Sequence, residues 1–236
     1  GAVWPMMTKS LKRFYKEAAV GSTDGGFNIL LDGKAVRSPK GHPLILSSRL
    51  LAQAVDEEWA LQGEKIDPET MPMMQMAATA LDRVAGERKA MLANLLRYAE
   101  TDLLCYRAAH PSDLVKKQTE LWQPVVDWAA LHLDAPLKIT DGLAPIDQPK
   151  EALTALAAHL AVLDDWRFTV LSVATSATGS LLLGLALVEG YLKADGLIAA
   201  SQLDEAHQRL LWGEDEEASL RLAALADDIR AAERFL

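Results

Sequence analysis

The segment from Phe168 to Val188 carries no charged side chain over 21 residues, and it constrains the fold more than any other part of the chain. A run of this length can cross a lipid bilayer as one helix. Charged residues bound it at Arg167 and Glu189, and several polar or small residues dilute it: Ser172, Thr175, Ser176, Thr178, Gly179 and Ser180. The pattern therefore predicts a buried core helix, or two helices broken near Gly179, rather than a membrane span.

The first fifty residues show the turn signals of a small antiparallel sheet. We expect strands over residues 13–20, 27–31, 35–37 and 44–46, with a turn over 21–26. Asp32-Gly33 is a hairpin signal, because both central turn positions need a positive φ. Ser48 can cap a following helix that ends at Gly63. Its apolar stripe would cover the sheet and consists of Leu51, Ala54, Val55 and Trp59.

After this helix, residues 65–72 contain two prolines and no periodicity, which favours a domain boundary. We therefore predict an α+β fold. A small N-terminal antiparallel β-sheet domain covered by one helix (residues 1–66) is followed by a larger all-helical domain (residues 67–236). The expected helices cover 73–84, 88–107, a segment beginning at Ser112 that Pro124 kinks or breaks, 149–163, 201–212 and 216–235.

Charge and cysteine content exclude several classes of function. The chain has 24 basic and 33 acidic residues, a net charge of -9, and no Lys/Arg-rich run, so we expect no nucleic-acid partner. An acidic surface instead suits a basic patch on another protein. The single Cys105 excludes an intramolecular disulfide and a multi-cysteine zinc site. Residues 1–10 lack the pattern of a secretory signal or a transit peptide.

Motifs for catalysis are weak. Asp204-Glu-Ala-His207 spells a helicase box, but the chain has no phosphate-binding loop and the box lies within a helical pattern. No two histidines are spaced as a helical metal site would require. A glycosidase-type pair of carboxylates stays open, although nothing in the sequence singles one out. We therefore predict a protein that is not an enzyme and needs no cofactor or metal.

Two further clusters each allow two interpretations. Met71, Met73, Met74 and Met76 can fill a core or form an adaptable binding surface. The acidic run Glu214–Glu217 suits the start of a helix, and it can equally meet a basic patch on a partner.

Several strings keep their order and spacing over most of the chain. They are Arg13-Phe-Tyr-Lys16, Leu31-Asp-Gly-Lys-Ala-Val-Arg-Ser-Pro39, Glu57-Glu-Trp59, Thr101-Asp102…Cys105-Tyr-Arg107, Trp122-Gln-Pro124…Trp128-Ala129 and Leu203-Asp-Glu205…Gln208…Trp212-Gly213. In these strings the chain resembles the assembly chaperone of the ATP synthase alpha subunit, known from mitochondria and some bacteria. The resemblance implies a protein that holds the unassembled alpha subunit, and keeps it from aggregating, until the beta subunit replaces the chaperone.

The late acidic helix is the expected contact with the alpha subunit. Asp204, Glu205 and Gln208 share one side of it, and with Glu214 they form the predicted partner-binding set. The resemblance places Glu205 where relatives carry an acidic residue important for activity. We expect Leu203, Leu210 and Leu211 to face the core, and a structural role for three tryptophans: Trp59, Trp122 and Trp128.

We further expect a monomer without stable membrane insertion. The expected compartment is the bacterial cytoplasm, or the mitochondrial matrix for a processed eukaryotic form. Two other classes of function stay open, namely a small hydrolase with an unrecognised carboxylate pair and a helical adaptor for another complex. The sequence leaves open which surface binds the partner and what triggers release.

Overall fold

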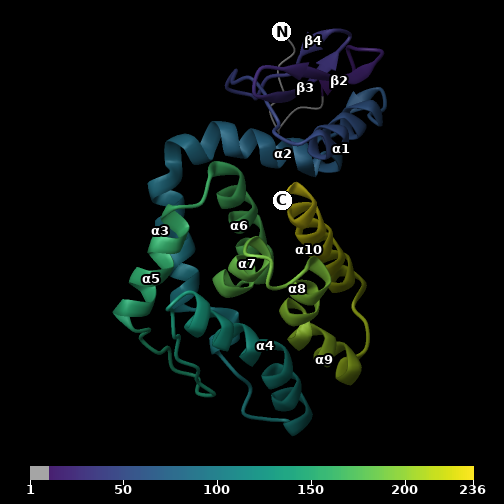
Figure 1. Cartoon of the computed structure of the whole chain (residues 1–236). Helices are drawn as coiled ribbons and strands as arrows, with labels where there is room; N and C mark the ends of the chain where they lie inside the picture. The colour runs from purple at the N-terminus through teal and green to yellow at the C-terminus, as the bar shows by residue number, and fades with distance from the viewer. Residues whose placement is uncertain (1–10) are drawn as a thin grey trace. The chain divides into compact units, whose positions relative to one another are not determined.

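The structure is a computed structural model that describes residues 11–236 (Figure 1). Residues 1–10, where the sequence predicts no targeting signal, lie outside this range. The chain divides into two compact units, the first ending at Arg88 and the second beginning at Lys89. The boundary predicted between residues 66 and 67 falls inside the first unit. A small antiparallel sheet in the first unit and helices elsewhere confirm the α+β class.

The first unit contains a three-stranded antiparallel sheet in the order β2 (Ala18–Thr23), β3 (Gly26–Leu31) and β4 (Lys34–Ala35). Asp32 and Gly33 have φ values of 48° and 82°, which confirms the predicted hairpin turn. The strand predicted from residue 13 begins only at Ala18. The reason is that the backbone N–H groups of Lys16 and Glu17 donate to the Asp32 carboxylate instead of to a neighbouring strand.

A second pairing joins distant parts of the first unit. β1 (Leu11–Lys12) lies antiparallel to β5 (Lys65–Ile66), and these two-residue strands are too short to leave a periodic signal. The Arg13 guanidinium donates to the carbonyl oxygens of Ala60 and Gln62 beside this pair. The predicted strand over 44–46 is only a bridge, in which Phe27 and Leu46 exchange backbone hydrogen bonds of 2.8 and 2.7 Å.

Helix α1 (Arg49–Ala60) covers β2 and β3 as expected. The Ser48 hydroxyl caps it by accepting from the backbone N–H of Leu51 at 3.3 Å. Trp59 is only 1% exposed. Its carbonyl accepts from the Tyr15 hydroxyl at 2.6 Å, and the two rings meet edge to face with centroids 5.9 Å apart.

The methionine cluster is part of this unit's core. After the short turn η1 (Pro68–Thr70), α2 (Pro72–Thr79) leads into the π-helical turn η2 (Ala80–Val84). The Glu58 carboxylate caps α2 by accepting from the backbone N–H groups of Met73 and Met74 at 2.8 Å each. All four methionines are buried, which decides between the two interpretations in favour of core packing: Met71, Met73, Met74 and Met76.

The second unit is helical. Its elements are α3 (Ala85–Glu100), which crosses the unit boundary, η3 (Leu103–Cys105), α4 (Ser112–His132), α5 (Lys150–Ala161), α6 (Asp165–Thr178), α7 (Leu181–Val188), α8 (Ala194–Ser201), α9 (Leu203–Trp212) and α10 (Glu216–Phe235). The short apolar helix α7 packs against α4, α6 and α8 (Figure 1).

The uncharged segment forms two helices, which confirms the predicted break. Gly179 ends α6 in the left-handed conformation, with φ 75°, and Ser180 caps α7 through the backbone N–H of Leu183. Gly184 lets α6 and α7 approach closely, because any larger residue would place its Cβ 2.5 Å from the Thr175 hydroxyl oxygen, which is too close. Within residues 11–236, no helix is long and apolar enough to cross a membrane.

Helices α3 and α4 differ from the sequence prediction, and helix α8 was not predicted. Helix α3 ends at Glu100 rather than residue 107, because Asp102 leaves the helical path and its carboxylate caps η3. Helix α4 continues through Pro124 without a break. An interior proline costs about 3 kcal/mol, and the apolar face on either side offsets this cost by burying Trp122, Val125 and Trp128.

Replacing Trp59 tests the contact between α1 and the sheet. We expect Trp59→Ala to lower the free energy of unfolding by about 3–5 kcal/mol, since it removes a fully buried ring. Trp59→Arg should leave the chain insoluble, because it buries an unpaired charge. Urea denaturation measures the first change, with Leu61→Ala, at the exposed C-cap of the same helix, as the control. An unchanged unfolding midpoint for Trp59→Ala would contradict the prediction.

Candidate partner-binding site

Helix α9 holds the acidic residues predicted to contact a partner. It packs against α4 and α8, and its buried positions are Leu203 and His207, four residues apart. Leu210 and Leu211 are 77% and 61% exposed, so the prediction that they face the core is wrong. The last three residues of α9 are all exposed. Trp212, at its end, is 84% exposed.

Asp204 has an intramolecular partner. Its carboxylate accepts from the side-chain amide of Gln118 in α4 at 2.8 Å. Gln118 is buried, and its amide oxygen accepts from the backbone N–H of Ala108 at 2.8 Å. A buried amide with both ends satisfied fixes the register of two segments. Asp204 therefore positions α9 on α4.

The other three predicted residues present their side chains to solvent. Gln208 and Glu214 are exposed, and Glu205 is half-exposed. Within the part of the chain that the structure describes, the carboxylates of Glu205 and Glu214 have no hydrogen bond or ion pair. Glu214 is thus open to a cation on another molecule, and Glu205 is open over its exposed part.

Two of the tryptophans predicted to be structural connect α4 to segments beside it, Trp122 to α8 and Trp128 to the loop between α7 and α8. The indole N–H of Trp122 donates to the carbonyl of Ala200 in α8 at 2.8 Å, and Trp122 is fully buried. Trp128 stacks on Tyr191 with ring centroids 5.0 Å apart and ring planes 8° apart. Arg107 places its guanidinium 5.9 Å from the Trp122 ring. These contacts hold the surface on which α9 lies.

Asp102 is a fully buried carboxylate in the second unit. Its oxygens accept from the Ser180 hydroxyl at 2.7 Å and from the backbone N–H groups of Leu182 and Leu104 at 3.0 Å each. Burial raises the pKa of Asp102 to about 6, although these hydrogen bonds oppose the shift. The carboxylate thus joins the segment after α3 to the beginning of α7.

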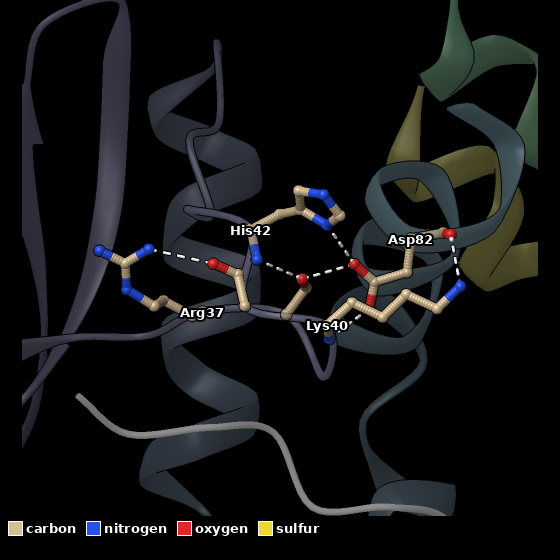
Figure 2. A network of polar contacts seen from close by, with 6 residues as sticks. Arg37, Lys40, His42 and Asp82 are labelled. Atoms are coloured by element: carbon tan, nitrogen blue, oxygen red, sulfur yellow. Dashed lines mark hydrogen bonds and ion pairs between the residues drawn. The ribbon is translucent and has the colours of Figure 1, made fainter. Parts of the chain in front are cut away.

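A polar network in the first unit is centred on Asp82 of η2 (Figure 2). One carboxylate oxygen accepts from the Ser38 hydroxyl at 2.5 Å and lies 2.7 Å from Nδ1 of His42. The other accepts from the backbone N–H of Lys40 at 3.0 Å, and the Lys40 ammonium donates to the Asp82 carbonyl. The network fixes the turn over residues 38–42 against η2.

This network does not have the order of a nucleophilic triad. In a triad the histidine lies between the nucleophile and the acid, whereas here Ser38 and His42 both bind Asp82 directly. Burial alone would raise the pKa of Asp82, but the hydrogen bonds from Ser38, His42 and Lys40 outweigh it and hold the pKa below its usual value. The arrangement stabilises a charged aspartate as the anchor of a turn.

Metal-binding and nucleophilic groups are not brought together. Residues 11–236 contain no group of three or more His, Cys, Asp or Glu side chains that could hold a metal ion. Burial raises the pKa of the Cys105 thiol to about 12, and the nearby Asp102 charge adds to the effect. A thiol of this kind stays protonated and is a poor nucleophile.

Comparison with known proteins decides the family. The family of the ATP12 chaperone protein matches residues 12–130. Atp12 from Paracoccus denitrificans, a solved crystal structure, is 41% identical, with a TM-score of 0.87 over 95% of this chain and 96% of that one. The chain belongs to the ATP12 chaperone family.

Two further comparisons agree with this assignment. A solved protein of Agrobacterium tumefaciens is 42% identical, with a TM-score of 0.88 over 96% of this chain and 85% of that one. The mitochondrial protein atp12 of Schizosaccharomyces pombe is 26% identical over 226 residues, which is 91% of this chain and 78% of that one. The family predicted from the sequence strings is therefore confirmed, and with it membership among chaperones of ATP synthase assembly.

Sequence reasoning missed the roles of Asp82 and Asp102. Asp102 lies in one of the strings that resemble the family, but the hydrogen-bond partners of both aspartates are far away in the sequence. Asp102 and Ser180 are 78 positions apart, and Asp82 and Ser38 are 44 apart. For Asp102 the available signal is an aspartate that follows an apolar helix face, which is typical of a capping residue.

Asp102→Asn tests the buried carboxylate. At pH 7.5 we expect this substitution to lower the free energy of unfolding by about 1–3 kcal/mol, since the amide N–H₂ of the new asparagine would face a backbone N–H donor. The pKa rises from 3.8 to about 6 on folding, so the protonated carboxyl stabilises the fold fully below pH 4, and this contribution is lost as the pH rises through 6. Because pH 4 lies close to the unfolded pKa, most of this contribution is present there, and the cost of the substitution should be about 2 kcal/mol larger at pH 4 than at pH 7.5.

Urea denaturation of both chains across this pH range measures the difference. Exposed Asp141→Asn is the control for the loss of one aspartate, and it should leave the pH dependence unchanged. Parallel curves for the wild type and Asp102→Asn would refute the assignment.

Proposed function

We propose that this protein binds the unassembled alpha subunit of the ATP synthase catalytic sector and prevents its aggregation until the beta subunit replaces it. Membership in the ATP12 chaperone family is the observation that carries the proposal. An isolated subunit exposes the apolar interface that its neighbour would cover. The encounter takes place in the bacterial cytoplasm, or in the mitochondrial matrix for a eukaryotic form.

The proposed contact is the solvent side of α9. Glu205 and Gln208 are three positions apart and share one side of the helix, and Glu214 follows shortly after the helix ends. Two carboxylates without an intramolecular ion pair favour a partner with Arg or Lys side chains. Asp204 contributes indirectly, because its bond to Gln118 sets the position of the helix.

The protein acts without catalysis in this proposal. We expect no phosphate release above background when the purified protein is incubated with ATP and Mg²⁺, because the Asp204–His207 string has no phosphate-binding loop beside it. A coupled phosphate assay measures turnover. Hydrolysis that disappears in Glu205→Gln would instead support the helicase-box interpretation.

Glu205→Lys tests the contact. We expect it to abolish protection of the alpha subunit, since it places a cation opposite the proposed basic surface. The fold should lose only about 0.3–1 kcal/mol, the cost of a cation in the first turn of a helix. Light scattering of alpha subunit diluted from denaturant measures protection, and thermal melting of the same sample measures stability.

Glu151→Lys is a matched control. Glu151 is also an exposed glutamate in the first turn of a helix, and α5 lies away from α9 (Figure 1). This variant makes the same charge change with the same helix-dipole penalty, and it should protect the alpha subunit normally. Full protection by Glu205→Lys would show that Glu205 is a solvated surface residue without a role in binding. If the wild-type protein binds the beta subunit and not the alpha subunit, the proposed function is refuted.

A further inference from the structure

The end of α9 exposes three consecutive large apolar side chains. Leu210, Leu211 and Trp212 form this apolar tip, and they are 77%, 61% and 84% exposed. Consecutive helical residues point about 100° apart, so three of them cover more than half of the circumference of the last turn. Gly213 then ends the helix. Isolated apolar residues on a surface are ordinary, but three adjacent ones that include a tryptophan are typical of an interaction site.

The apolar tip continues the face of α9 that carries the proposed contact. Glu205, Gln208 and Trp212 follow one another at spacings of three and four residues, which places them on one side of the helix. Leu203 and His207 occupy the opposite, buried side. A molecule bound to Glu205 and Gln208 therefore reaches Trp212 by extending its contact along the same face.

Acidic residues border the apolar tip. Glu214, Asp215, Glu216 and Glu217 follow it directly, and all four are exposed. This acidic segment disfavours two possible occupants. A second copy of the chain would bring two such segments together on molecules of net charge -9, and an anionic membrane surface would repel the same carboxylates. A protein surface with apolar side chains bordered by Lys or Arg fits both features.

We propose that the apolar tip inserts into an apolar depression on the partner protein that is edged by Lys or Arg, and that the acidic segment pairs with these cations. The inference rests on the proposed function, since it names the kind of surface on the alpha subunit that the chaperone recognises. Tryptophan is the side chain most often found at the energetic centre of an interface. The charged rim adds orientation and association rate.

Binding to immobilised alpha subunit tests the apolar tip. Trp212→Ser and Leu211→Ser should each weaken the affinity at least about tenfold with unchanged melting temperature, because neither side chain packs in the fold. Val162→Ser, which removes an 81% exposed apolar side chain at the end of α5, should bind like the wild type. Undiminished binding by Trp212→Ser would overturn the inference.

A pair of short amphipathic peptides gives a readout that does not need the alpha subunit. One carries a leucine stripe bordered by lysines, and the other has glutamates in their place. We expect only the lysine peptide to bind the wild-type protein, and its affinity to fall as NaCl rises from about 50 to 500 mM. The lysine peptide should also bind the Trp212→Ser variant more weakly than the wild type. Equal binding of both peptides would overturn the role of the acidic segment.

Two further outcomes would assign the apolar tip to another occupant and overturn the inference. One is a dimer in analytical ultracentrifugation that dissociates in Trp212→Ser, and the other is binding to phosphatidylglycerol vesicles that this substitution removes. A wild-type protein that leaves the alpha subunit unbound would refute the proposed function, and the peptide experiment would then still decide the role of the apolar tip.

Discussion

The buried carboxylate of Asp102 is the interaction on which the helical unit depends. A lone charge in an apolar interior is strongly unfavourable unless donors surround it, and here the donors come from η3, from Ser180 and from the first turn of α7. Helix α7 packs on α4, and α4 in turn positions α8 and α9 through Trp122 and Gln118. The position of the exposed face of α9 thus depends, through successive contacts, on a carboxylate with no exposure to solvent.

Local signals were sufficient for much of the fold. The turn at Asp32-Gly33, the Ser48 cap and the break at Gly179 each depend on residues adjacent in the chain, and the sequence predicted all three. Predictions failed where distant residues decide. Helix α3 stops early because the Asp102 carboxylate binds groups 78 and 80 positions away, and β1 forms only when residues 65–66 lie beside it.

For the candidate site, too, local patterns predicted some features and missed those that depend on distant residues. Helical spacing correctly placed Glu205 and Gln208 on one accessible side of α9. It also predicted that Leu210 and Leu211 would be buried, and this prediction is wrong. Helical spacing describes the faces of a helix, but it does not tell how far the neighbouring helices extend. Asp204 shows a third case, since its partner Gln118 is 86 positions away and no local pattern distinguishes it from Glu205.

The pairing of β1 with β5 has a consequence for how the first unit forms during synthesis. Leu11 leaves the ribosome long before Ile66, its partner in the ladder. The hairpin of β2 and β3 and the helix α1 use nearby residues and can form early. The edge at β1, with the Arg13 contacts to Ala60 and Gln62, closes only after the later segment emerges. Until then β1 stays unpaired, so its pairing with β5 comes after the local contacts of the hairpin and α1.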